Sequence, residues 1–74
     1  MNPCVALFHS RIEAQRAQAV LRERHVGCVL VCPPPKLADT AQYGVRFAAA
    51  DREAAKLIFD AAGIVPRAIC NWES

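Results

Sequence analysis

The chain has 74 residues, of which 54% are hydrophobic and 22% are charged, with nine basic and seven acidic side chains. This composition excludes a disordered chain, and the length predicts one small domain over residues 1–74. A formal net charge of +2 gives no reason to expect nucleic acid or an anionic membrane as a partner.

No apolar run approaches the roughly 20 residues of a transmembrane helix. The N-terminal Met-Asn-Pro-Cys also lacks the basic segment of a signal peptide. We therefore expect a cytoplasmic protein without a membrane partner, whose four cysteines are free thiols.

The first half of the chain predicts a strand and then a helix. Residues 4–9 form an almost continuous apolar run, which is typical of a strand buried on both faces. Ser10 and Glu13 have capping-box spacing, so we expect a helix that begins after Ser10 and ends near Arg24. Its expected inner stripe consists of Ala14, Ala17, Val20 and Leu21.

The middle of the chain predicts two strands. The β-branched segment 28–32 forms the second strand, and Pro33–Pro35 ends it because proline donates no ladder hydrogen bond. A polar loop over 36–41 follows. Apolar and small or polar residues then alternate over 43–47, which predicts a third strand with one apolar face.

The last third predicts a helix and an edge strand. Asp51 is the expected N-cap of a helix over 52–62, and Gly63 ends it in the left-handed conformation. The broad buried face of this helix is expected to consist of Ala54, Ala55, Ile58, Phe59 and Ala62. Residues 65–70 form the fourth strand, where Pro66 favours an edge position.

This order of elements predicts an α+β domain of the ferredoxin-like type, βαββαβ. Its antiparallel four-stranded sheet has the order 4-1-3-2, with both helices on one face. The two halves also resemble each other at an offset of 38 residues. The matching pairs are Ala17 with Ala55, Val20 with Ile58, Val26 with Ile64, Val31 with Ile69, and Cys32 with Cys70.

The predicted sheet suggests where the thiols lie. We expect the central first and third strands to be parallel, and the second and fourth to run antiparallel to them. The start of the first strand then lies beside the end of the fourth, and the end of the second lies at the same end of the sheet. Cys4, Cys32 and Cys70 would share one rim, with Cys28 toward the opposite end.

These cysteines permit more than one interpretation. Buried free cysteines often serve as small core residues, and Cys4 and Cys70 lie within apolar strands. Cys32 differs because it stands at a strand end against prolines, where a thiol is accessible. A soft-metal site made of Cys4, Cys32 and Cys70 is the weaker alternative. The sequence contains no catalytic motif, so we expect neither an enzyme nor a cofactor.

The predicted sheet is apolar on both faces, although two helices can cover only one. Cys4, Ala6 and Phe8 alternate with Val5 and Leu7 in the first strand. One of these sets must face away from the helices, and large exposed apolar patches are unusual on monomers. We therefore expect a homodimer, or a protein partner, at the open sheet face.

Over about residues 4 to 70, the chain resembles the selenium/sulfur carrier-like family of small bacterial proteins, a domain of unknown function. The residues that carry the resemblance are His9-Ser10, Ala17, Val20, Leu21, Val31-Cys32-Pro33-Pro34, Leu37, Val45-Arg46-Phe47, Asp51 and Ala62-Gly63-Ile64. The resemblance implies a small protein in which one exposed cysteine carries sulfur or selenium as a persulfide-type adduct.

The family's characteristic cysteine lies late in the second loop, at a position that aligns with Ala41 of this chain. The expected carrier residue is therefore missing. Either Cys32, at the other end of the same loop, replaces it, or this chain has lost the carrier chemistry. A thiol-independent binding or oligomerisation module is the alternative function.

Overall fold

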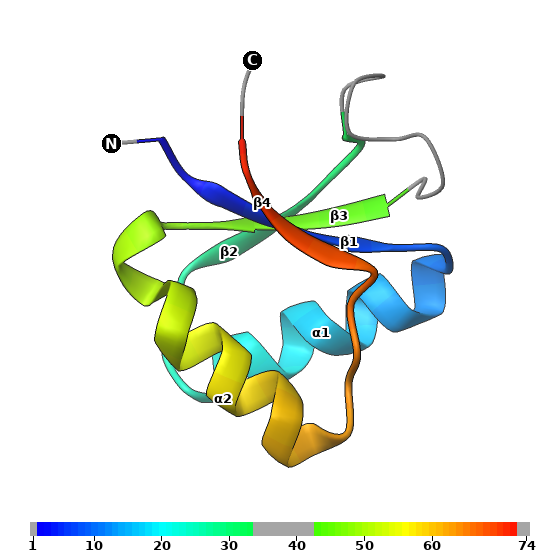
Figure 1. Cartoon of the computed structure of the whole chain (residues 1–74). Coiled ribbons are helices and arrows are strands. Elements are labelled where there is room, and N and C mark those ends of the chain that lie inside the picture. Colours follow the sequence, from blue (N-terminus) through cyan, green and yellow to red (C-terminus); the bar gives the residue numbers. More distant parts are fainter. Residues whose placement is uncertain (1, 34–42, 73–74) are drawn as a thin grey trace.

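The computed structural model describes residues 2–33 and 43–72 of the chain. The sequence-predicted elements are present in the expected order (Figure 1). They are β1 (Cys4–Phe8), α1 (Arg11–Glu23), β2 (Cys28–Val31), β3 (Tyr43–Phe47), the 3₁₀ turn η1 (Ala49–Asp51), α2 (Arg52–Ala62) and β4 (Ala68–Asn71).

The four strands form one antiparallel sheet in the order β2-β3-β1-β4, which is 4-1-3-2 when read from the β4 edge. β3 pairs with β1 on one side and with β2 on the other, and β4 pairs with β1. The prediction that the first and third strands are parallel is wrong, because Cys4 pairs with Phe47 and Phe8 with Tyr43.

The direction of β2 follows from these pairings. β2 is antiparallel to β3, and β3 is antiparallel to β1, so β2 runs in the same direction as β1. This is the usual result when a helix connects two strands of one sheet, because the chain returns to its starting end before the next strand begins. Cys28 therefore lies in the same row as Cys4, with Phe47 between them.

Both helices lie on one face of the sheet, as Figure 1 shows. The main core lies between the helices and this face. Its fully buried members include Ala17 and Leu21 of α1, Phe8 of β1 and Phe59 of α2. The rings of Phe8 and Phe59 meet edge to face with centroids 6.2 Å apart. Ala54, which was predicted to be buried on α2, is instead exposed.

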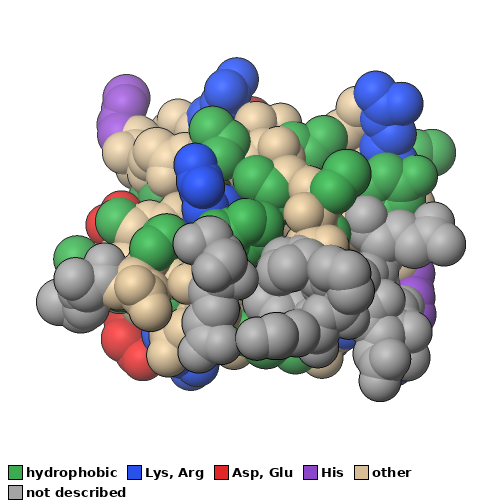
Figure 2. All heavy atoms as spheres, turned by 90° about the horizontal axis from the view of Figure 1, so that it is seen from above, with side chains coloured by type: hydrophobic (Ala, Val, Ile, Leu, Met, Phe, Trp, Pro, Cys, Tyr) green, Lys and Arg blue, Asp and Glu red, His purple; other side chains and the backbone are tan. Residues whose placement is uncertain are grey.

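The opposite face of the sheet also buries apolar side chains. Val5 and Leu7 are buried there against the half-buried Val31, Cys70 and Trp72. In Figure 2, which looks onto this face, hydrophobic side chains are visible with Lys and Arg side chains among them. Burial of Val5 and Leu7 within the chain removes most of the exposed patch on which the homodimer prediction rested.

The helix ends follow from local chemistry. Ser10 has an extended backbone, and its hydroxyl accepts a hydrogen bond from the Glu13 amide at 3.5 Å, which confirms the predicted N-cap of α1. Asp51 precedes α2 but makes no side-chain capping bond, since η1 leads into this helix. Gly63 ends α2 with a φ of 70°, as predicted.

Candidate functional site

Cys32 is the cysteine that the structure leaves exposed. It lies one residue beyond the end of β2, while Cys4 is buried and Cys28 and Cys70 are half-buried. Pro33, which follows it, is buried and holds the chain against the protein at this point. Cys32 is thus an accessible thiol at a corner of the sheet, and accessibility is one of the conditions for a reactive thiol.

Cys4 belongs to the main core, where only 1% of the residue is exposed. Its Sγ lies 4.0 Å from Oδ1 of Asn71, its partner across β1 and β4, so the thiol makes only a weak hydrogen bond. A surface hollow of about 370 Å³ borders both residues. A thiol so deeply buried reaches a reagent only when the structure opens.

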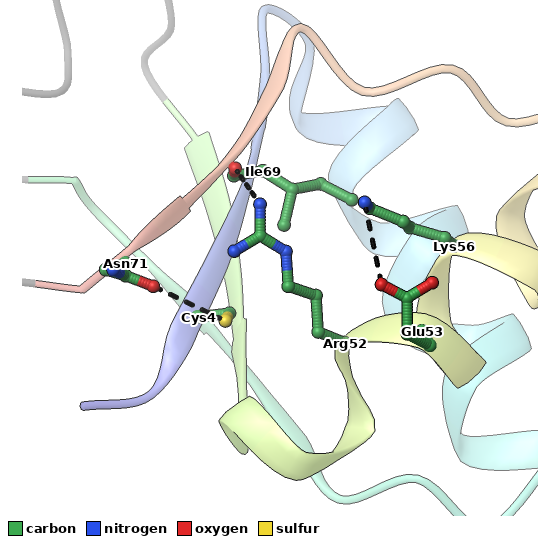
Figure 3. Close-up of polar contacts among 6 residues, drawn as sticks. All are labelled: Cys4, Arg52, Glu53, Lys56, Ile69 and Asn71. Atoms are coloured by element: carbon green, nitrogen blue, oxygen red, sulfur yellow. Dashed lines mark hydrogen bonds and ion pairs between the residues drawn. The ribbon is translucent and has the colours of Figure 1, made fainter. Parts of the chain in front are cut away.

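Arg52 at the start of α2 extends across to β4, beside Cys4 and Asn71 (Figure 3). Its Nη2 donates a hydrogen bond to the carbonyl oxygen of Ile69 at 3.4 Å. One turn further along α2, Lys56 and Glu53 form an exposed ion pair at 3.9 Å. The sequence alone does not reveal the contacts of Arg52 and Asn71. The signal that could have found Asn71 is the antiparallel pairing of the first and last strands.

Cys28 packs against α1 at the start of β2. Its Sγ donates a hydrogen bond to the carbonyl oxygen of Gln18 at 3.6 Å. Burial raises the pKa of the Cys28 thiol, and the nearby Arg22 guanidinium opposes this effect by favouring the thiolate. The net result is a thiol that stays protonated at neutral pH and is therefore a poor nucleophile.

Cys70 lies on the face of the sheet opposite to the helices. It pairs with Val5 across β1 and β4 and packs in the cluster that contains Leu7 and Trp72. On the same face the guanidinium of Arg46 lies 5.7 Å from the centroid of the Trp72 ring, within the range of a cation–π interaction. This contact was also missed at the sequence level, although Trp72 is the only tryptophan in the chain.

The predicted thiol rim is only partly present. Cys4 and Cys70 do lie on adjacent strands near one end of the sheet, as expected. Their side chains point to opposite faces, because Cys4 packs in the core under the helices and Cys70 in the cluster on the other face. The positions of Cys28 and Cys32 are the reverse of the prediction: Cys28 lies at the Cys4 end, and Cys32 lies at the opposite end.

This geometry contradicts the three-cysteine metal site. A tetrahedral site with sulfur ligands needs Zn–S distances of about 2.3 Å, so its sulfurs must converge on one point. Here Cys4 and Cys70 lie on opposite faces of the sheet, and Cys32 lies at the other end of the sheet from both. Within residues 2–33 and 43–72, no three His, Cys, Asp or Glu side chains are grouped to hold a metal ion.

Ala41, which takes the place of the family's loop cysteine, lies outside the described residues, as does the whole of the predicted loop over 36–41. In the part of the chain that the structure describes, neither helix has the length and hydropathy needed to cross a bilayer. These observations leave Cys32 as the accessible thiol among the four cysteines.

The chain was compared with known families, curated proteins and solved structures. It matches the family described as "Putative Se/S carrier protein-like" over residues 3–71, which include all four cysteines. No curated protein and no solved structure matches it. Since the family match covers nearly the whole chain, this α+β domain belongs to the Se/S carrier protein-like family.

Proposed function

We propose that this protein is a small, non-catalytic, cytoplasmic carrier that holds sulfur, or selenium in its place, on Cys32. The observation that carries the proposal is the exposure of Cys32 at the end of β2, in a chain that belongs to a carrier-like family. The strand order and helix placement support a ferredoxin-like assignment for its fold.

The proposed loading step is thiol–persulfide exchange with a protein or low-molecular-weight persulfide. The Cys32 thiolate attacks the terminal sulfur of the donor persulfide. A new S–S bond forms at Cys32, and the S–S bond of the donor breaks. The bonding electron pair leaves with the donor as a thiolate. The step has no net oxidation, so it needs no further oxidant or reductant. A thiol acceptor unloads Cys32 by the same exchange.

Mass spectrometry of the intact protein tests the proposal. The protein is incubated with glutathione persulfide, and we expect a mass increase of one sulfur atom that peptide mapping locates on Cys32. The variant Cys32→Ser should lose the adduct. The matched variant Cys28→Ser, which removes a half-buried thiol, should keep it. An adduct that persists in Cys32→Ser, or that forms on no cysteine, contradicts the proposal.

The second candidate function is a binding or oligomerisation module that does not use its thiols. The observation that favours it is the exposed side chain of Val29 in β2, a strand without any charged residue. Partner binding that is unchanged in Cys32→Ser would support this function, whereas binding that requires Cys32 would support the carrier.

A further inference from the structure

The sheet has two edge strands, β2 and β4, whose outer sides pair with no other described strand. Edge strands present unpaired backbone groups to any extended chain, so soluble proteins usually block them with charges, prolines or covering side chains. The two edges of this sheet differ in that respect.

The outward-facing groups of β4 follow from its register. The Trp72 amide donates to the Pro3 carbonyl oxygen at 2.6 Å, so this pair is hydrogen-bonded. Hydrogen-bonded and non-bonded pairs alternate along an antiparallel ladder. Cys70 therefore bonds to β1, whereas Ile69 and Asn71 direct their backbone groups outward. The Arg52 guanidinium occupies the Ile69 carbonyl oxygen, which blocks this edge.

The same alternation carries across to β2. Because Val5 bonds to β4, its neighbours Cys4 and Ala6 bond to β3, through Phe47 and Val45. The other two residues within β3, Arg46 and Gly44, then direct their backbone groups to β2.

In β2 these inward-bonded residues are Val29 and Val31, the partners of Arg46 and Gly44. The backbone groups of Leu30, and those of Cys28, consequently face the free edge.

The β2 edge lacks the protection that β4 has. Its sequence, Cys-Val-Leu-Val, contains neither a charged residue nor proline. Val29 is 42% exposed, and Leu30 is half-buried. Among the described residues, no side chain donates a hydrogen bond to a backbone group of β2, and the Cys28 thiol donates to the Gln18 carbonyl oxygen of α1 instead. As far as residues 2–33 and 43–72 define it, the edge is apolar and open to pairing.

We propose that a second copy of this chain pairs antiparallel with this edge, β2 to β2, with Leu30 at the twofold axis. This register places Leu30 opposite Leu30 of the second copy, and Cys28 opposite Cys32 of the second copy. It is the register that uses every outward-facing position of residues 28–32. Two sheets joined in this way make one continuous eight-stranded sheet.

A second copy fits this edge better than an unrelated strand for two reasons. An antiparallel pair is self-complementary, as a twofold interface requires. Segment 28–32 also carries no charge, so two copies bring no like charges opposite each other. Val29 lies opposite Val31 of the second copy, which covers the exposed valine with a β-branched partner. The inference does not depend on sulfur transfer.

Hydrogen exchange measured at several protein concentrations tests the pairing in the unmodified protein. The Leu30 amide should become more protected as the concentration rises, because dimerisation gives it an acceptor. The Asn71 amide, on the blocked β4 edge, is the internal control and should be unaffected. Leu30 exchange that is independent of concentration overturns the proposal, even if sedimentation equilibrium detects a dimer formed through another surface.

A matched pair of variants gives a second test. Val29→Lys places a charge on the proposed interface, whereas Val65→Lys makes the same change at a valine that is 85% exposed on the α2–β4 connection. Sedimentation equilibrium should show a dimer dissociation constant raised at least tenfold for Val29→Lys, and no change for Val65→Lys. Equal dimerisation of the two variants overturns the proposal. Sulfur acceptance by Cys32 in Val29→Lys is measured separately, so failure of one proposal leaves the other standing.

Discussion

Val5 packs so closely over Gly44 that a β-carbon on the glycine would lie 2.7 Å from Val5 Cγ2. Val5 is fully buried, and Gly44 also approaches Val31 on the same face. We expect Gly44→Ala to reduce the free energy of unfolding by about 1–3 kcal/mol, because the added methyl group forces side chains or strands apart. Urea unfolding followed by circular dichroism measures the change.

Two controls isolate the contact. A β-carbon on Gly27 would meet no atom within 4 Å, so Gly27→Ala should change stability little. The double variant Gly44→Ala with Val5→Ala should lose less than the sum of the two single effects, since the shorter side chain makes room for the methyl group. Strict additivity of the two changes would contradict this explanation.

The four cysteines should react with iodoacetamide at very different rates. Cys32 is exposed and Cys4 is 1% exposed. Alkylation of Cys4 therefore needs local opening, and an opening free energy of about 3 kcal/mol would slow it about 100-fold relative to Cys32. Time-resolved peptide mapping of the native protein checks the order. Labelling of another cysteine before Cys32 would remove the support for Cys32 as the carrier.

The contrast between Cys32 and Cys4 also indicates what the sequence could predict. Apolar runs, the Ser10 cap and Gly63 were sufficient for the element order and for the α+β class. The rim prediction is wrong because β2 runs in the same direction as β1 and not opposite to it, which moves Cys32 to the other end of the sheet.

Faces were harder to predict than elements. Alternation shows that Cys4 and Val5 point to opposite sides, but it cannot show which side the helices cover. The Arg52–Ile69 hydrogen bond joins residues 17 apart and depends on the exact placement of α2 against β4. Such contacts are set by packing and leave no local pattern in the sequence.

The stability of the protein should fall as the pH rises above the ordinary pKa of a thiol. Burial raises the pKa of Cys28 in the folded state, so the unfolded chain loses this proton at a lower pH than the folded chain does. The protonated Cys28 thiol therefore contributes to the free energy of unfolding at neutral pH, and this contribution is lost as the pH rises through the folded-state pKa of Cys28. Urea unfolding at a series of pH values should show a smaller alkaline loss in Cys28→Ala than in the unmodified protein.

Replacing Arg22 provides an independent check on the causes assigned to the raised pKa of Cys28. Its guanidinium favours the thiolate, so Arg22→Gln should raise the pKa of Cys28 further. The pH profile of Cys28 alkylation, followed by peptide mapping, should shift to higher pH in this variant. Arg16→Gln, an exposed substitution on the same helix, should leave the profile unchanged. A shift to lower pH in Arg22→Gln would contradict the assigned role.

The two helices end in the same way. The Val26 amide donates to the Leu21 carbonyl oxygen at 2.9 Å, and the Ile64 amide donates to the Phe59 carbonyl oxygen at 2.8 Å. In each case the residue immediately before the amide donor is left-handed: His25 with a φ of 63°, and Gly63 with a φ of 70°. These are Schellman endings, 38 residues apart.

The internal repeat therefore holds at the helix ends, whereas in the strands it fails. Val31 and Ile69 also lie 38 residues apart, but they pack on opposite faces of the sheet. The two helix ends share one backbone geometry, so the residue at the left-handed position of α1, His25, can be compared directly with Gly63 at the same position of α2.

That comparison predicts a stabilising substitution at His25. A side chain in the left-handed region costs about 1 kcal/mol or more, and glycine occupies the equivalent position of α2 without that cost. His25 is exposed, so replacing it removes no buried contact. We expect His25→Gly to raise the free energy of unfolding by about 0.5–1 kcal/mol, after the greater entropy of the unfolded glycine chain is subtracted. His25→Ala keeps the β-carbon and the strain, so it should give no gain. Urea unfolding of the three proteins checks the order, and equal stability of the Gly and Ala variants would show that the backbone conformation at His25 carries no strain.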